Sequence, residues 1–136
     1  MIWTLDTDIL VYFVNRKSGY ERIARRMSGR SHGEVRASAI TLAELRFGIE
    51  RGLFRSENEA KLNELLGILQ VDDFPAGAAK DFGEIKSALL SGGKTIGPYD
   101  LLIAAHARHI GAVLVTNNER EFRRVPGLSV QNWLKP

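Results

Sequence analysis

The first fifteen residues, Met1-IWTLDTDILVYFV-Asn15, decide how this chain folds. Residues 2–5 are an apolar run that ends at Asp6, which is typical of a short strand. Residues 7–15 are apolar nearly all round, which predicts a buried helix directly after that strand. A strand that passes into a helix at an acidic residue indicates an α/β domain with polar side chains at the junction.

The same alternation continues along the chain. Further strands are expected at residues 34–39, 68–71, 112–115 and 128–130, and helices at 20–27, 41–52, 57–67, 76–90 (after Pro75) and 98–111, with a short helix after Asn118. Strands that alternate with helices predict an α/β sandwich around a mostly parallel sheet. A length of 136 residues suits one domain, which we place at residues 1–136.

Composition narrows the possible functions. The chain is 44% hydrophobic with a net charge of +3, so it can bury a core and favours an acidic partner such as nucleic acid. It contains no cysteine, which excludes disulfides, thiolate zinc sites and cysteine nucleophiles. The N-terminus lacks the pattern of a signal peptide and the apolar runs are too short for a bilayer, so a cytoplasmic protein without membrane contact is expected.

Four acids stand at expected strand-to-helix junctions. Junctions of this kind gather at the carboxyl edge of a parallel sheet, where ligands usually bind. Carboxylates packed together repel one another unless a cation neutralises them, and hard divalent ions such as Mg²⁺ or Mn²⁺ prefer oxygen ligands. We therefore expect a metal-assisted site for hydrolysis of a phosphodiester. The four acids are Asp6, Glu44, Asp100 and Glu121.

Each acid also has a purely structural interpretation. Residues 41–44, Thr-Leu-Ala-Glu, form a capping box in which Glu44 bonds the backbone at the start of its helix. Asp6 is a candidate N-cap, and Asp100 in the first turn after Pro98 suits the helix dipole. Taken one at a time, these local roles explain the acids well. They explain less well why an acid stands at every junction.

Five segments carry a family resemblance. Residues 5–8, 40–48, 97–100, 115–122 and the ending 125–134 resemble the VapC toxin family of PIN-domain ribonucleases. The resemblance covers nearly the whole chain, with the motifs in the family's order. It implies a single PIN-like domain with a mostly parallel five-stranded sheet flanked by helices.

The resemblance also implies an activity and partners. The expected activity is that of an Mg²⁺- or Mn²⁺-dependent endoribonuclease, the toxin of a type II toxin–antitoxin pair. The expected partners are an RNA substrate, with initiator tRNA as the first guess, and a small VapB-like antitoxin. Relatives of this kind commonly form homodimers and larger toxin–antitoxin assemblies.

Three acids match the family's most characteristic positions. These are Asp6, Glu44 and Asp100, and the resemblance makes them the expected metal ligands. Asp6 and Asp100 would bind the principal ion directly or through water, while Glu44 completes the pocket. Asp8 replaces the Asn that commonly follows the Asp-Thr pair, and this change adds a negative charge near the metal.

The fourth acidic position has two candidates. Some relatives have Asp where Asn118 stands, and others use the acid before the phenylalanine, which is Glu121 here. We assign the position to Glu121 and regard Asn118 as a hydrogen-bonding neighbour. Together with Glu44, Glu121 would hold a second ion or orient the attacking water.

Two other functions remain open. Residues 6–8, Asp-Thr-Asp after an apolar strand, also resemble the first motif of haloacid-dehalogenase-type phosphatases, although Ile9-Leu10 departs from that pattern and no matching Lys and paired-Asp motifs follow. A catalytically silent RNA-binding domain on the same fold is the second alternative. Metal binding without RNA cleavage would support it.

Several basic residues suit either RNA contact or a solvated surface. Arg46 shares a helix with Glu44, and both a phosphate contact and an ion pair with a site acid are possible roles for it. Two basic stretches suit RNA backbone binding, an antitoxin contact or a solvent-facing helix. They comprise Arg22, Arg25, Arg26 and Arg30, and Arg120, Arg123 and Arg124.

Histidines and aromatic residues receive structural interpretations. His106 and His109 have an i, i+3 spacing that can bind metal, but no further ligand is evident nearby and packing or surface roles are favoured. Tyr12, Phe13 and Phe47 are expected mostly in the core. Any of them left exposed would be a candidate contact for the antitoxin's apolar segment.

Overall fold

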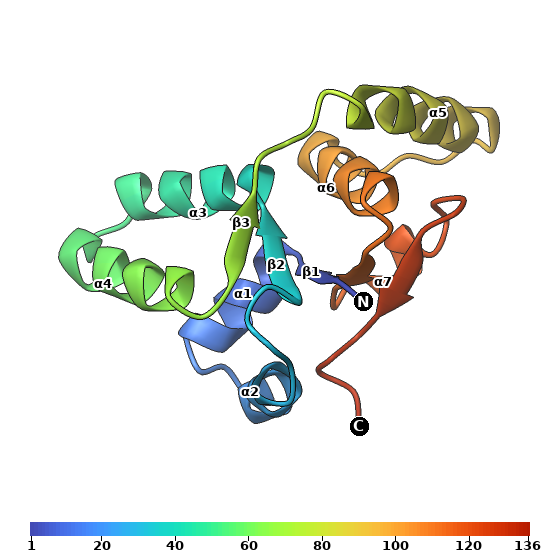
Figure 1. Ribbon diagram of the computed structural model, residues 1–136. Helices are drawn as coiled ribbons and strands as arrows, with labels where there is room; N and C mark the ends of the chain where they lie inside the picture. The colour runs from blue at the N-terminus through green and yellow to red at the C-terminus, as the bar shows by residue number, and fades with distance from the viewer.

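The computed structural model describes residues 1–136 as one five-stranded sheet with helices on both faces (Figure 1). The strands are β1 (Trp3–Leu5), β2 (Val35–Ser38), β3 (Gln70–Asp72), β4 (Val113–Val115) and β5 (Ser129–Gln131). The helices are α1 (Thr7–Val14), α2 (Tyr20–Ser28), α3 (Ala39–Arg51), α4 (Arg55–Leu66), α5 (Ala78–Ser91), α6 (Pro98–His109) and α7 (Glu119–Phe122). The strand order is β3-β2-β1-β4-β5, and every neighbouring pair is parallel. The expected α/β fold with a five-stranded parallel sheet is thus confirmed.

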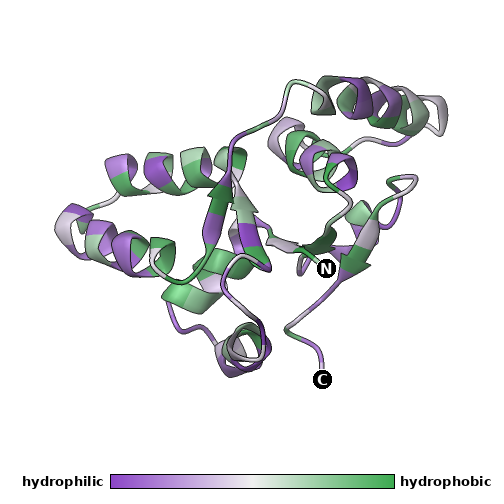
Figure 2. Cartoon of the chain, in the orientation of Figure 1, coloured by the Kyte–Doolittle hydropathy of each residue, from purple (hydrophilic) through white to green (hydrophobic).

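The strand order divides the helices between the two faces of the sheet. Crossovers between parallel strands are right-handed, so α1 to α4 cover one face and α5 to α7 the other (Figure 1). Consecutive residues of β4 show the division, because Val115 packs in the cluster with α1 and α4 and Leu114 in the cluster with α5 and α6. Hydropathy follows burial: α1 is mostly hydrophobic, whereas α4 is largely hydrophilic (Figure 2). None of the helices has the length and apolar character needed to cross a membrane.

The sheet has a topological switch point between β1 and β4. From β1 the chain moves outward to β2 and β3, then returns to the other side of β1 with β4. The Asp6 amide donates to the Val115 carbonyl at 3.0 Å, which extends the β1–β4 pairing to the last residue before α1. Ligands of open α/β sheets bind in the crevice at such a point, outside the carboxyl ends of the strands.

The start of α3 differs from the expectation. The helix begins at Ala39, and Ser38 is its N-cap, with its side chain accepting from the Ile40 amide at 3.1 Å. Thr41 is therefore fully buried inside the helix, and Glu44 lies in the second turn rather than the first. The capping-box interpretation is wrong, because the hydroxyl at the end of β2 caps the helix three residues earlier.

Other boundaries shift by a few residues. Helix α5 begins at Ala78, because Pro75 belongs to a preceding turn in which its carbonyl accepts from the Ala78 amide at 3.0 Å. Strand β3 begins at Gln70, two residues after the expected start. These shifts leave the order of the elements as predicted.

Aromatic packing joins the two ends of the chain on the face of the sheet that α1 to α4 cover. Trp3 in β1 and the fully buried Trp133 after β5 have ring centroids 6.5 Å apart. The Arg30 guanidinium lies over both rings, 4.1 Å from the Trp3 centroid and 4.7 Å from that of Trp133. Stacking of this kind stabilises the fold through burial and through the attraction of a cation to the ring face.

We predict that Trp133→Ala lowers the free energy of unfolding by about 3–5 kcal/mol, because it opens a cavity and removes one ring from beneath Arg30. Urea unfolding followed by far-ultraviolet circular dichroism measures this change. Leu53→Ala is the matched control, since Leu53 is 93% exposed, and should stay within about 0.5 kcal/mol of the wild type. Equal stability of the two variants would contradict the packing role of Trp133.

Candidate active site

Asp6 is the buried centre of the acidic group. It directly follows β1 and is only 3% exposed. Its Oδ1 accepts from the Ile9 amide at 3.0 Å, so Asp6 is the N-cap of α1 as well as a site acid. The fully buried Thr116, just past β4, also hydrogen-bonds the Asp6 side chain and partly offsets the effect of burial on the Asp6 pKa.

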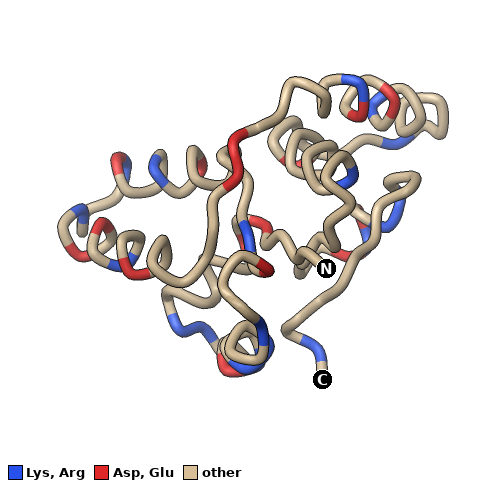
Figure 3. The backbone as a smooth tube through the Cα atoms, in the orientation of Figure 1, with Lys and Arg blue, Asp and Glu red and all other residues tan.

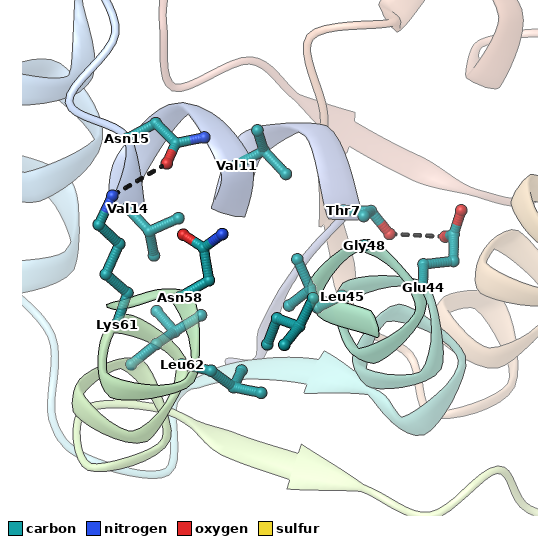
Figure 4. A pocket seen from close by; sticks show the side chains of 12 residues that line it. Thr7, Val11, Val14, Asn15, Glu44, Leu45, Gly48, Asn58, Lys61 and Leu62 are labelled. Carbon is teal, nitrogen blue, oxygen red and sulfur yellow. Dashed lines mark hydrogen bonds between the residues drawn. The ribbon is translucent and has the colours of Figure 1, made fainter. Parts of the chain in front are cut away.

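Glu44 reaches the site from α3. The Thr7 hydroxyl donates to Glu44 Oε1 at 2.6 Å, and this bond joins the first turn of α1 to the second turn of α3 (Figure 4). Thr7 Oγ1 also lies 3.4 Å from the Thr41 hydroxyl. Thr7, the residue that follows Asp6 in the chain, therefore holds the Glu44 carboxylate in place.

Asp100 comes from the opposite face of the sheet. It lies in the first turn of α6, as expected, where Pro98 opens the helix after Gly97. The carboxyl group is half-buried. Contact between α3 and α6 brings this helix start to the carboxyl edge of the sheet, beside Glu44.

Glu121 is positioned by its asparagine neighbour. Asn118 Nδ2 donates to Glu121 Oε2 at 2.8 Å, and the Asn118 amide donates to Thr116 Oγ1 at 2.9 Å. A short chain of hydrogen bonds thus runs from the end of β4 to Glu121 in α7. Asn118 is the hydrogen-bonding neighbour that we expected from the sequence.

Burial and repulsion raise the pKa of two site acids. Burial raises the pKa of Asp6 to about 7, and the negative charges of Asp8 and Asp100 add to this effect. Burial also raises the pKa of Asp100 to about 6, with further contributions from Glu44, Asp8 and Glu121. These mutual effects show that the structure brings all four predicted acids, and Asp8, into one electrostatic group.

None of these acids has a cationic partner. Within 4.0 Å, no Lys, Arg or His nitrogen pairs with any of the four, whereas Asp72, Asp81 and Glu119 all form ion pairs elsewhere. Repelling carboxylates without a counter-charge are an incomplete electrostatic arrangement, which a bound cation would complete.

The donor atoms fit a hard divalent ion, although the side chains are not gathered into a finished coordination shell. No three His, Asp or Glu groups lie in a ready metal-binding arrangement. In both Glu44 and Glu121, one oxygen accepts a protein hydrogen bond and the other is left for a ligand. A few carboxylate oxygens suit Mg²⁺ or Mn²⁺, because these ions also retain several waters as ligands.

Three residues considered from the sequence lie outside the acidic group. Arg46 pairs with Glu59 of α4, so the suggested ion pair with a site acid is wrong. His106 is buried, with its Nδ1 2.7 Å from the Ser38 hydroxyl and its ring edge against Phe74. His109 lies at the surface and pairs with Asp81. The two histidines therefore have the favoured packing and surface roles.

Sequence reasoning gave no role to Thr7 and Thr116. Both lie within the quoted motifs, Thr7 two residues after β1 and Thr116 directly after β4, and both supply a hydroxyl that orients a site residue. A threonine within two residues of a buried strand end was the available signal. Its meaning depended on the register between β1 and β4, which the sequence alone does not give.

Two apolar hollows border the acidic group. One, of about 240 Å³, lies between α1, α3 and α4, with Glu44 at one end and Lys61 at the other (Figure 4). The second, of about 390 Å³, lies between α3 and α6 and is lined mainly by Ile40, Ala43, Phe47, Tyr99 and Leu102. Phe47 is 67% exposed there, so the expectation of a core position was wrong for this residue, while Tyr12 and Phe13 pack against the core.

Comparisons with known proteins agree with this geometry. The chain is 39% identical over 140 residues to ribonuclease VapC2 of Rickettsia felis, covering 99% of this chain and all of that protein. It is 36% identical to the tRNA(fMet)-specific endonuclease VapC of Shigella flexneri, covering 95% and 96% of the two chains.

Solved structures agree as well. A chain of the VapBC2 structure from Rickettsia felis, bound to a promoter DNA fragment, superposes with a TM-score of 0.89 at 37% identity, covering 98% of this chain and 99% of that one. A chain of the DNA-bound VapBC structure from Salmonella typhimurium superposes with a TM-score of 0.88 at 36% identity, covering 98% of both chains. The family pattern described as PIN domain matches residues 4–128. This chain belongs to the PIN-domain family, among the VapC ribonucleases.

Proposed function

We propose that this chain is the toxin of a VapBC-type toxin–antitoxin pair and cleaves RNA with the help of Mg²⁺ or Mn²⁺. The observation that carries the proposal is the group of four acids at the switch point, none of which has a cationic partner. The family supports a ribonuclease over the phosphatase alternative. Because a relative is a tRNA(fMet)-specific endonuclease, initiator tRNA is the first substrate to test.

The acids divide into two roles. Asp6 is the N-cap of α1, and Asp100 lies in the first turn of α6 on the other face of the sheet, where its charge acts on Asp6. These two acids would hold the principal ion, with Glu44 as a further ligand. The chemistry that such an ion supplies is activation of water and neutralisation of charge on the phosphodiester. Glu44 and Glu121, each oriented by a neighbouring side chain, keep one oxygen free to accept a proton or a water hydrogen.

A VapB-like antitoxin is the proposed protein partner. Two of the similar crystal structures are VapBC assemblies, which supports a hetero-oligomer for this chain. The hollow between α1, α3 and α4 offers an apolar surface that ends at Glu44 (Figure 4). An apolar segment bound there would cover the approach to the acids and thereby inhibit the enzyme.

A homodimer through α3 and α6 is the second proposed assembly. Phe47 and Tyr99 are 67% and 59% exposed on the same apolar hollow. Exposed aromatic residues at the centre of an apolar patch are typical of interfaces. A second copy of the chain would bury both rings.

We predict that Asp100→Asn lowers RNA cleavage by at least about a hundredfold, because it removes a ligand and a charge from the site. Cleavage of total tRNA by purified protein is measured with Mg²⁺, with Mn²⁺ and with EDTA. Asp73→Asn, an exposed acid just past β3, is the matched control and should retain wild-type cleavage. Equal cleavage by Asp100→Asn and the wild type would refute the site assignment, and tRNA left intact under all conditions would refute tRNA as the substrate.

We predict that Asp6→Asn stabilises the metal-free protein increasingly as pH rises. Since burial raises the Asp6 pKa to about 7, the stability contributed by the neutral acid is present below pH 4 and is lost as pH rises through 7. Between pH 5 and pH 8 the advantage of Asp6→Asn should grow by up to about 3 kcal/mol in EDTA, since asparagine also caps helices. Urea unfolding at both pH values measures the change.

The same experiment tests the ion. Excess Mg²⁺ or Mn²⁺ should stabilise the wild type at pH 8 and leave Asp6→Asn nearly unaffected, because only the wild type retains the ligand. Asp73→Asn serves again as the control and should respond like the wild type. A pH-independent difference between Asp6→Asn and wild type would contradict the raised pKa.

We predict that Phe47→Glu converts the dimer to a monomer, because a charge at the centre of the apolar patch cannot be buried without a partner. Light scattering coupled to gel filtration measures the mass. Leu90→Glu is the matched control, since Leu90 is 59% exposed on α5, away from the patch. Unchanged mass for Phe47→Glu would exclude α3 and α6 as the interface.

A further inference from the structure

A third hollow, of about 460 Å³, is mainly polar and lies beside α2. Its walls come from α1, the α1–α2 connection, the start of α2, the loop after β4 and the C-terminal segment. They include Tyr12, Glu21, Arg22, Asn117 and Leu134. Its volume is within the range of small-ligand sites, and its polar character distinguishes it from the two apolar hollows.

The hollow adjoins the acidic group through two walls. Tyr12 lies four residues after Asp8 on α1, so the two side chains share one face of the helix. Asp8 lies in the first turn of α1, two residues after the N-cap Asp6, so this face of the helix begins beside the acidic group. On the other wall, Asn117 directly follows Thr116, which contacts Asp6.

One cation of the lining, Arg22, and one at its rim, Lys17, which precedes Ser18 of the lining, have no acidic partner. Arg22 Nη1 donates to the Leu134 carbonyl at 2.7 Å, which orients the guanidinium and leaves its other N–H groups unused. Lys17 lies in the α1–α2 connection, with its Nζ 5.2 Å from the centroid of the Tyr12 ring. Neither forms an ion pair, and Glu21 is the single acid of the lining. Blue positions along the α1–α2 connection and α2 mark this basic region in Figure 3.

Other basic residues are already used by the fold. Arg30 lies over two tryptophan rings, Arg123 and Lys135 both pair with Glu119, and Arg46 pairs with Glu59. Arg25 is exposed on α2 without an ion pair, but it does not line the hollow and, unlike Lys17, has no cation–π contact with Tyr12 of the lining. The structure therefore separates Arg22 from the rest of the basic stretch in which the sequence places it.

A third donor completes the set. Asn132 Nδ2 donates to Asn117 Oδ1 at 3.2 Å, and this bond turns the Asn117 amide so that its own N–H₂ group is free to donate. A guanidinium, an ammonium and an amide that lack acceptors match the oxygens of a phosphate. Charged contacts of this kind position a nucleic-acid strand without reading its sequence.

We propose that this hollow binds a phosphodiester of the RNA strand next to the one that is cleaved, held by Arg22 and Asn117 of the lining and by Lys17 at the rim. The inference rests on the proposed RNA cleavage. It extends that function by naming the surface along which the RNA strand continues beyond the carboxylates. The flanking phosphate enters the basic hollow while the scissile one lies at the acids. The strand is thereby anchored where its charge is favourable, beside a group of acids that repels it.

The test compares two double variants with the same change in net charge. Lys17→Gln/Arg22→Gln removes the cation of the lining and the one at its rim, and glutamine at position 22 can still donate to the Leu134 carbonyl. Arg25→Gln/Lys80→Gln removes two exposed cations elsewhere. Binding of a fluorescein-labelled single-stranded RNA of mixed sequence is measured by anisotropy in EDTA, over a series of salt concentrations. Cleavage of the same RNA with Mg²⁺ then gives kcat and KM.

The hollow variant is expected to bind RNA roughly tenfold more weakly, with the slope of log affinity against log salt reduced by about 0.7 for one lost phosphate contact. Its KM should rise by a similar factor while kcat stays within about twofold, because the lost contacts hold the flanking phosphate in ground and transition states alike. The control variant should remain within about twofold in every quantity. Equal losses in the two double variants would overturn the proposal, since they would reflect net charge alone.

Other outcomes separate this proposal from the proposed function. RNA cleavage by the wild type with unchanged RNA affinity in the hollow variant would leave the ribonuclease standing and remove the subsite. If RNA binding depended on the hollow but the wild type did not cleave RNA, the binding site would stand and the proposed ribonuclease activity would fall. If the hollow variant bound a polyglutamate peptide more weakly than the wild type but bound RNA equally well, the hollow would be assigned to an acidic protein. That result would overturn the RNA subsite. A wild type that binds no RNA would overturn both.

Discussion

The burial of one carboxyl group, that of Asp6, is the constraint on which the rest of the site depends. Asp6 occupies the position where β1 ends at the switch point of the sheet, and it is 3% exposed. Such a group is costly in its ionised form unless hydrogen bonds or a cation compensate, and the bonds from Ile9 and Thr116 leave its pKa near 7. The surrounding acids raise that cost. The fold thus holds an unfavourable charge in place, and the divalent ion proposed for this site would compensate it.

Much of this arrangement could be predicted from the sequence. Apolar runs that end in acids predicted the order of strands and helices, and the rule that parallel strands meet at one carboxyl edge predicted that Asp6, Glu44, Asp100 and Glu121 would converge. The electrostatic influence of Glu44 and Glu121 on Asp100 agrees with that convergence. These predictions succeeded because they rest on periodicity and topology, which depend little on side-chain detail.

The errors lay where several residues competed for one role. Ser38 and Thr41 both suit an N-cap, and only the end of β2 decides in favour of Ser38. Arg46 was equally compatible with several partners, and the packing of α3 on α4 brought Glu59 within reach. The separation of Arg22 from Arg25 likewise depends on the path of the C-terminal segment, whose Leu134 carbonyl orients Arg22. Spacing along the chain carries no information on such contacts.

The structural and functional interpretations of the acids turn out to be compatible. Asp6 caps α1 through one oxygen, and Asp100 lies at a helix start, where the dipole favours a negative charge. Helix N-termini therefore lower part of the cost of bringing these acids together, since each aligned peptide array supplies a partial positive charge at the site. Glu44 and Glu121 lie deeper in their helices or on a very short one, and each depends instead on a side-chain donor, Thr7 or Asn118. Backbone dipoles thus support the two acids proposed as the principal metal ligands, and side-chain hydrogen bonds orient the two acids proposed to handle water and protons.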